Sequence, residues 1–430
     1  MDPVQVSLIL FGVFTLLIPL GVPIAHALGA AALCLILAAG IPGVFLPQTI
    51  YHATDQFPLI AVPFFVLVGY LMEYGGVSCK LTDMASALVG HVTGGFAAVT
   101  IVSCMFFAAM SGAGPATVAA IGTIMIPAMI RSGYPAPFAG AVASTGGTLG
   151  IMIPPSTPMI IYAVVGNVSV TQMFIAGVAP GLLTRLVLIV ASWWICRRYG
   201  YTARTERASS REIARAFWNG CWALMAPVIV LGGIYGGVFT PTEASIIAVN
   251  YALVVGFFMY RELNFRKFVD AFVKSVMVGG TVTIIVGVAG AFGRLLTQYQ
   301  IPQMLSEAVL SHTDNVYVVM IIIAVGLIII GTFMETLATI VLLTPILLPV
   351  CVSVGIDPIL FGILLVITSE IGFLTPPLGA NLFVAAPIAK VSLEAISLAV
   401  LPFIALLCAV VLILILFPIL SVGLPELLSR

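Results

Sequence analysis

One stretch of this chain occurs twice, and the two copies align without a gap. Residues 111–158 recur as residues 333–380, an offset of 222 positions, which is 349 minus 127 for the aligned pair Pro127 and Pro349. A repeat with helix breakers at matching places, in a chain that crosses a membrane, predicts a substrate site between two related halves. Other identical pairs include Ala116-Thr117 with Ala338-Thr339, Gly133 with Gly355, Gly140 with Gly362, Gly150 with Gly372, and Pro154-Pro155 with Pro376-Pro377.

The composition indicates a membrane protein. Of the residues, 61% are hydrophobic and only 7% are charged, whereas soluble domains carry about 25% charged residues. Apolar runs such as 393–420 exceed the ~20 residues that a helix needs to cross a bilayer, and they lack the alternation of a membrane β-strand. We therefore expect an all-α polytopic protein in contact with a lipid bilayer. The net charge of zero does not suggest nucleic acid as a partner.

Two basic segments set the expected orientation. Residues 197–215 contain six Arg, residues 261–274 contain four Lys or Arg, and two apolar runs lie between these segments. Two spans return the chain to the same side, so both segments are expected in the cytoplasm and the N-terminus outside. The hairpin region 92–131 then enters from the cytoplasm and the region 316–352 from outside, which is an inverted-topology repeat. The simpler interpretation of the basic segments is that they encode topology and bind no ligand.

Four segments interrupt the apolar runs. Residues 111–117 and 333–339 read as tips of re-entrant hairpins, and residues 146–158 and 369–381 read as unwound segments, because each Pro-Pro removes two backbone donors. Unwound backbone within a membrane is tolerated where it lines a protein or water-filled cavity. A single break would suggest only a kink for packing, but two matched pairs favour a binding site.

Carbonyl and hydroxyl oxygens at these breaks suit a small cation, and the adjoining helix N-termini suit an anion. The expected cation ligands are Ser111, Gly112, Gly114, Thr117, Gly147, Thr148, Ile153, Pro154, Thr336, Thr339, Ser369, Glu370, Thr375, Pro376 and Gly379.

Charged groups inside apolar runs are candidates for function. Arg294 is expected to bind a substrate carboxylate, because guanidinium pairs with carboxylate through two hydrogen bonds; the alternative is that its side chain extends out to the membrane surface. Glu335 could line the substrate path or bind a cation, or it could cap a helix N-terminus. Arg185 is expected to extend outward or to contact another subunit. The remaining substrate candidates are Ser156, Thr157 and Asn381.

Several motifs together resemble the large membrane subunit of tripartite ATP-independent periplasmic (TRAP) transporters, over nearly the whole chain. They are residues 57–65 (FPLIAVPFF), 111–117 (SGAGPAT), 150–156 (GIMIPPS), 232–243 (GGIYGGVFTPTE) and 375–381 (TPPLGAN). The resemblance implies a sodium-coupled elevator transporter of the bacterial inner membrane that moves an organic anion. It also implies two partners, a small membrane subunit and a periplasmic binding protein. The small subunit is expected to be a separate chain, because the first apolar run begins at Val6.

The same resemblance suggests a division of the chain. Scaffold helices are expected at 1–90, 176–275 and 276–315, and a C-terminal helix at 393–430. The transport domain is expected at 91–175, with a hairpin at 92–131 and a broken helix at 134–166, and at 316–392, with a hairpin at 316–352 and a broken helix at 357–390.

Other function classes are weaker. A Gly-Lys dipeptide is absent from the sequence, so a nucleotide-binding P-loop is excluded. An intramembrane enzyme would need a nucleophile beside a base, which the motifs do not supply. A stand-alone sodium–carboxylate carrier remains an alternative. C4-dicarboxylates are the first expected substrate class, and sugar acids such as sialic acid the second.

Overall fold

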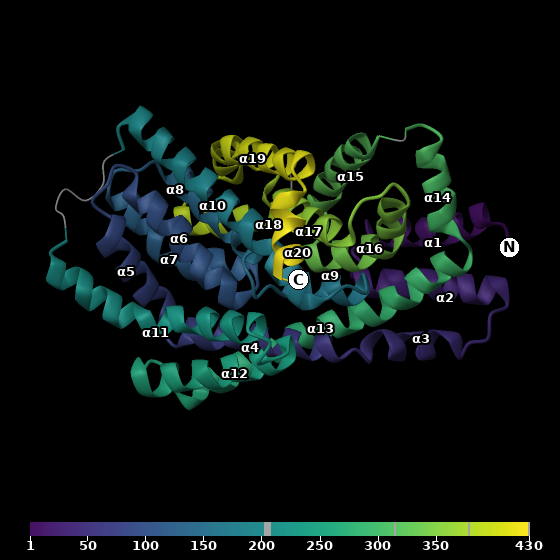
Figure 1. Ribbon diagram of the computed structural model, residues 1–430, viewed down its shortest axis with the longest axis horizontal. Coiled ribbons are helices and arrows are strands. Elements are labelled where there is room, and N and C mark those ends of the chain that lie inside the picture. The colour runs from purple at the N-terminus through teal and green to yellow at the C-terminus, as the bar shows by residue number, and fades with distance from the viewer. Residues whose placement is uncertain (202–207, 314, 377–378, 429–430) are drawn as a thin grey trace.

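The computed structural model describes residues 1–428 except 202–207, 314 and 377–378, and no β-strand occurs among them. Eight of its helices are long and apolar enough to cross a membrane, and a bent pair of shorter helices makes a ninth. The described part of the chain thus confirms the all-α, multi-span prediction. Figure 1 shows the helices arranged in two layers that meet along the long axis of the molecule.

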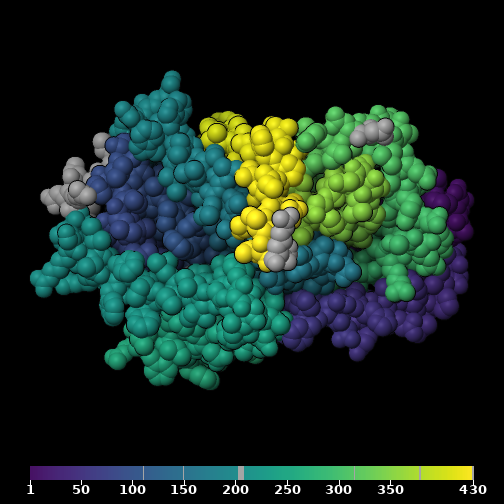
Figure 2. All heavy atoms as spheres, viewed as in Figure 1, coloured from purple at the N-terminus to yellow at the C-terminus, as the bar shows by residue number. Residues whose placement is uncertain are grey.

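The first layer is built around one long helix, α13 (Phe265–Gln298), which packs against α2, α3 and α4. Its helices α3, α4, α11 and α12 lie along the lower edge of Figure 1, the teal and purple lower face of Figure 2, whereas α1 lies at the right beside the N-terminus. The first layer also contains α11, which packs on α12, and α12, which packs on α4. Its other members are α1 (Pro3–Leu17), α2 (Ile24–Ala39), α3 (Phe45–Thr54), η1 (Phe57–Ile60), α4 (Ala61–Tyr74), α11 (Ser210–Tyr235), α12 (Pro241–Val254) and the π-helical turn η3 (Val255–Met259).

The second layer contains both copies of the repeat. Two short helices, α5 (Val77–Val89) and α14 (Ile301–Leu310), each connect a helix of the first layer to a helix of the second along the chain. The first copy comprises α6 (Gly95–Ser111), α7 (Gly114–Arg131), α8 (Ala136–Thr148), η2 (Leu149–Met152) and α9 (Thr157–Val165). The second comprises α15 (Val316–Gly331), α16 (Thr336–Ser353), α17 (Pro358–Leu374) and α18 (Ala380–Ala389). Around them pack α10 (Val170–Tyr199), α19 (Leu393–Leu416) and α20 (Ile419–Leu428).

The helix boundaries reproduce the offset read from the sequence. Adding 222 to the ends of α7, residues 114 and 131, gives residues 336 and 353, the ends of α16. The same shift takes residue 136, where α8 begins, to the start of α17, and residue 152, where η2 ends, to the end of α17. The residue repeat is therefore a structural repeat of a helix pair followed by a broken helix.

The breaks are shorter than the sequence predicts. Residues 146–148 and 369–374 remain helical, so the described residues outside helices in the two breaks are 153–156, 375–376 and 379, and Pro377 and Leu378 lie outside the described residues. Each helix ends two residues before the first proline of its pair, Pro154 or Pro376, because the residue before a proline is disfavoured in helical geometry. The expected scaffold range 176–275 also begins inside α10, which packs on α6, α17, α19 and α20 of the second layer.

The motif at residues 232–243 ends in the residues that start a helix. In residues 240–243 the Thr240 hydroxyl accepts from the backbone N–H of Glu243, whose carboxylate accepts from the backbone N–H of Thr240 at 2.8 Å. Pro241 occupies the first helical position, where its missing N–H costs nothing. These residues fix where α12 begins after the turn that follows α11.

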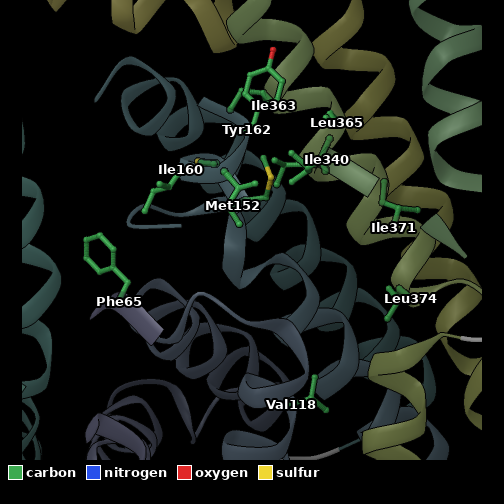
Figure 3. Packing of buried hydrophobic residues seen from close by; sticks show 14 of the residues in the cluster. Phe65, Val118, Met152, Ile160, Tyr162, Ile340, Ile363, Leu365, Ile371 and Leu374 are labelled. Carbon is green, nitrogen blue, oxygen red and sulfur yellow. The ribbon is translucent and has the colours of Figure 1, made fainter. Parts of the chain in front are cut away.

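Aromatic packing holds the two repeats together (Figure 3). Tyr162 of α9 is fully buried, and a Cβ on Gly362 of α17 would lie only 2.2 Å from its ring. The Tyr162 hydroxyl donates a hydrogen bond to the backbone carbonyl of Pro358, at the start of α17. The glycine at 362 therefore leaves room for the ring against the neighbouring helix, which ties α9 of one repeat to α17 of the other.

Candidate functional site

The tip of the first helix pair is closed by its own hydroxyls. Gly112 has φ of 62°, a left-handed conformation that turns the chain between α6 and α7. Thr117 donates to the carbonyl of Ala113 at 2.9 Å, and the hydroxyls of Ser111 and Thr117 lie 3.0 Å apart. A Cβ on Gly112 would lie 2.6 Å from the hydroxyl of Thr157, so this tip rests directly on the N-terminus of α9.

The tip of the second helix pair repeats one of these bonds and adds a carboxylate. Thr339 donates to the carbonyl of Glu335 at 3.0 Å, which is the Thr117–Ala113 bond shifted by 222 positions. Thr336 instead donates to Oε1 of Glu370 in α17, at 2.6 Å. The second tip is therefore tied to the broken helix of its own repeat through a buried charged group.

Five residues from both repeats meet at one point inside the second layer. The Asn381 amide donates to the Thr148 hydroxyl at 2.6 Å, which in turn donates to the carbonyl of Ser144. From a Cβ placed on Gly114, Asn381 Oδ1 would lie 3.4 Å away and Glu370 Oε2 3.5 Å away. We call this cluster the junction; it comprises Gly114, Thr148, Thr336, Glu370 and Asn381.

The junction contains two pairs of residues that are equivalent in the two copies of the repeat. A shift of 222 converts Gly114 into Thr336 and Thr148 into Glu370, and all four positions belong to the cluster. When two copies are related by a symmetry axis, equivalent positions meet only near that axis. The site is chemically asymmetric, because the first copy contributes a glycine and a hydroxyl where the second contributes a hydroxyl and a carboxylate.

Two buried side-chain oxygens at the junction lack a hydrogen-bond partner among the described residues. They are Glu370 Oε2 and Asn381 Oδ1, and Glu370 and Asn381 are 1% and 0% exposed. A buried carboxylate without a counter-charge is strongly unfavourable. A small cation or a proton would relieve this cost. The donor set available is oxygen only, and among the described residues no three His, Cys, Asp or Glu side chains gather as a metal cluster.

The other expected cation ligands make contacts of their own. Ser369 and Thr375 donate to carbonyls one helical turn back, at 2.7 and 2.6 Å, so their oxygens can only accept further bonds. Gly147 is packed against Val118 of α7, where a Cβ would come within 2.4 Å. Ile153, Pro154, Pro376 and Gly379 lie in the unwound segments or at their ends.

Arg294 lines a cavity of about 360 Å³ between the two layers. Its walls come from α13, from the end of α9 near Asn167, from the segment after α3 at Gln56, and from α16 at Pro345. Arg294 itself is exposed, and it is the single charged side chain among the described lining residues. The position of the guanidinium between the layers is compatible with the predicted role of binding an anion.

The remaining substrate candidates do not lie beside Arg294 in this structure. Glu335 lines a different cavity, of about 280 Å³, with Phe333 and Phe383, and it caps α16 without a side-chain hydrogen bond. Ser156 caps α9 by accepting from the backbone N–H of Met159, at 3.5 Å. Ser156, Thr157 and Asn381 are buried, so the present arrangement joins Asn381 to the junction rather than to a substrate cavity.

Two further features were missed or misjudged from the sequence. A Cβ on Gly69 of α4 would lie 2.6 Å from Cα of Ser111, so the first tip touches the first layer at a glycine that no charge or motif spacing marks. The expected outward course of Arg185 is wrong, because this side chain is only 3% exposed. Its helix, α10, is covered by α6, α19 and α20, a packing that the local sequence does not reveal.

The comparisons with known proteins agree with this architecture. Residues 11–420 match the family model of the tripartite ATP-independent periplasmic transporter, DctM component. The chain belongs to this family. A relative from Oleidesulfovibrio alaskensis, the isethionate TRAP transporter permease protein DctMQ, is 46% identical over 96% of this chain, which spans 65% of that protein's length.

Other DctM relatives match end to end. The C4-dicarboxylate TRAP transporter large permease protein of Rhodobacter capsulatus is 36% identical over 98% of this chain and 99% of its own length. The sialic acid TRAP transporter large permease protein of Vibrio cholerae is 36% identical over 95% of both chains. The DctM chain is thus a multi-pass membrane component of a transporter.

Solved structures share the fold at low identity. The YdaH transporter of Alcanivorax borkumensis has a TM-score of 0.64 at 14% identity, covering 87% of both chains. MtrF of Neisseria gonorrhoeae has a TM-score of 0.58 at 14% identity, covering 90% of this chain and 84% of that one. These similarities show a shared transporter fold and nothing about the substrate.

Proposed function

We propose that this DctM chain is the large membrane subunit of a sodium-driven importer of organic anions in the bacterial inner membrane. The observation that carries the proposal is the junction, where two buried oxygens from the second repeat face Gly114 of the first. Family membership supports a place in a three-part transporter, with a separate small membrane subunit and a periplasmic binding protein that delivers the substrate.

Sodium binding at the junction would couple the two repeats. A cation between Glu370 Oε2 and Asn381 Oδ1 would neutralise the buried carboxylate, which also accepts from Thr336 at the second tip. Both tips and both broken helices therefore contribute to the surroundings of one ion. In this mechanism the filled junction fixes the tips, and the second layer moves against α4 and α13 as an elevator carrying ion and substrate together.

The anion is assigned to the cavity at Arg294. A guanidinium offers two parallel N–H donors to a carboxylate or a sulfonate, and a volume of about 360 Å³ is within the range of small-molecule sites. C4-dicarboxylates are the first candidate, in line with the relative from Rhodobacter capsulatus. Isethionate is a second candidate. It is a monoanion, which matches the single charged side chain among the described lining residues, and the relative at 46% identity is named for it.

The test is uptake by proteoliposomes that contain this chain and its small subunit, with the binding protein and an inward sodium gradient. Glu370→Gln should raise the sodium concentration for half-maximal uptake by about 10- to 100-fold, because a charge-assisted interaction is worth about 1.5–3 kcal/mol. Glu307→Gln, an exposed carboxylate on α14, is the matched control and should behave as wild type.

Two outcomes would overturn parts of this proposal. Unchanged sodium activation in Glu370→Gln would remove the junction from the coupling mechanism. Uptake by the chain alone, without the binding protein, would favour the stand-alone carrier. Competition by unlabelled succinate and isethionate in the same assay separates the two substrate candidates.

A further inference from the structure

A groove of about 1040 Å³ runs between α10 and α19, on the outside of the second layer and away from the sites described above. Its α10 wall extends from Leu186 to Tyr199, and its α19 wall from Ala399 to Leu406. The lining is apolar along most of this length, and Leu186 and Val190 are 61% and 52% exposed. A long apolar channel of this kind on a membrane protein is a place for a hydrophobic ligand.

The length of the groove indicates which ligand. From Leu186 to Tyr199 there are 13 helical steps, or roughly 20 Å at about 1.5 Å per residue. That is enough for one leaflet including its headgroup region, whereas a partner helix that crosses the bilayer needs the full ~30 Å of hydrocarbon. The groove therefore matches a lipid of one leaflet better than a transmembrane helix.

The polar end of the groove carries a positive charge among aromatic rings. Arg198 lines the groove and lies 5.4 Å from the ring centroid of Trp194, and Arg197 lies 5.3 Å from that of Trp193. Trp and Tyr gather where a membrane meets water. Arg198 is the single charged side chain among the described lining residues, and a guanidinium pairs with phosphate through two hydrogen bonds.

We propose that this groove binds an anionic phospholipid of the cytoplasmic leaflet, with its phosphate on Arg198 and its acyl chains along α10 and α19. The leaflet follows from the basic segment 197–215, which the positive-inside rule assigns to the cytoplasm, where anionic headgroups are attracted to Arg. Since α10 and α19 pack on α6, α8 and α17, the lipid belongs to the second layer. The proposal does not depend on which ion or anion the protein transports.

Trp193 and Trp194 provide the readout, because both line the groove. The full-length chain with Trp218→Phe and Trp222→Phe keeps only these two of its four tryptophans. It is reconstituted in phosphatidylcholine vesicles that contain a small fraction of dibrominated phosphatidylglycerol or dibrominated phosphatidylcholine. Quenching should favour the anionic lipid by about fivefold in apparent affinity, the effect of one Arg near a membrane surface.

Three variants test the assignment. Arg198→Gln should reduce the preference for the anionic lipid to about equal, whereas Arg211→Gln, on the same basic segment but outside the groove, should retain it. Ala405→Phe, which narrows the groove, should lower quenching by both lipids. Equal quenching in the starting protein, or a preference that survives Arg198→Gln, overturns the proposal. Loss of small-subunit co-purification in Ala405→Phe with unchanged quenching would show a protein partner instead, and would also reject it.

Discussion

The two repeats share a backbone plan and differ in chemistry. Their helices begin and end within two residues of equivalent positions, and the bond from Thr117 to the carbonyl of Ala113 recurs between Thr339 and Glu335. The first tip is held by glycine and hydroxyls against α9 and α4. The second tip is held to α17 by a carboxylate, Glu370. The repeated part thus sets the geometry, and the divergent positions supply the charge.

This difference assigns separate roles to the two copies. A carboxylate on both sides of the junction would place two like charges in one buried site, which is strongly unfavourable. With Thr148 at the position equivalent to Glu370, the first copy contributes a hydroxyl that bonds Asn381, and only one charge needs neutralising. Each of the following changes tests whether a feature belongs to the shared plan or to one copy.

The largest effect is expected at the first tip. Gly112→Val places a β-branched residue at φ of 62° and drives its Cβ toward the Thr157 hydroxyl, 2.6 Å away. The backbone strain alone costs about 1–3 kcal/mol, so a marked fall in the apparent unfolding temperature is expected. Met334→Val, the equivalent substitution at the second tip, lacks this conformation and should change that temperature little. Similar shifts in both variants would mean that the tips are interchangeable.

An exchange of charge across the junction comes next. The double variant Thr148→Glu with Glu370→Thr moves the carboxylate to the equivalent position of the other repeat. Sodium activation of uptake should return in part, to within about tenfold of wild type, since one carboxyl group remains near the same point; tenfold corresponds to about 1.4 kcal/mol. Each single variant should perform worse than the double. If the double is no better than Glu370→Thr alone, the junction does not lie on the axis of the repeat.

A smaller difference is expected between the repeated threonines. Thr117→Val removes a donor to Ala113 and a neighbour of the Ser111 hydroxyl, whereas Thr339→Val removes only the bond to Glu335. At roughly 1 kcal/mol per hydrogen bond, both variants should need several-fold more sodium for half-maximal uptake, and Thr117→Val more than Thr339→Val. Sodium titration of uptake measures the order, and identical curves for wild type and both variants would remove these hydroxyls from the site.

Much of this architecture can be predicted from the sequence because its causes are local. Proline and glycine mark the tips and breaks, and the constant offset of 222 positions is a property of the sequence itself. Four of the five junction residues are among the cation ligands expected from the sequence. Their meeting at one point, together with Asn381, could not be predicted, because Asn381, Thr148 and Glu370 come together only through packing of residues far apart in the chain. The same long-range packing buries Arg185, which contradicts its expected outward course, and it buries Asn381, whose role in substrate binding stays a prediction.

The smallest effect is expected at the tie between the repeats. Tyr162→Phe removes the hydroxyl that donates to the Pro358 carbonyl but keeps the ring on Gly362. That carbonyl belongs to the first turn of α17 and retains its helix bond, so the loss should be near the low end of a single hydrogen bond, about 0.5–1 kcal/mol. The thermal unfolding temperature should fall by about 0.5–1 °C, since the shift per kcal/mol becomes smaller as the chain becomes longer. Tyr317→Phe, on an exposed tyrosine of α15, is the control and should shift it less. A marked fall in sodium-driven uptake at an almost unchanged unfolding temperature would mean that this bond links the motions of the two copies. A bond that only stabilises the fold would leave the uptake of the folded protein unchanged.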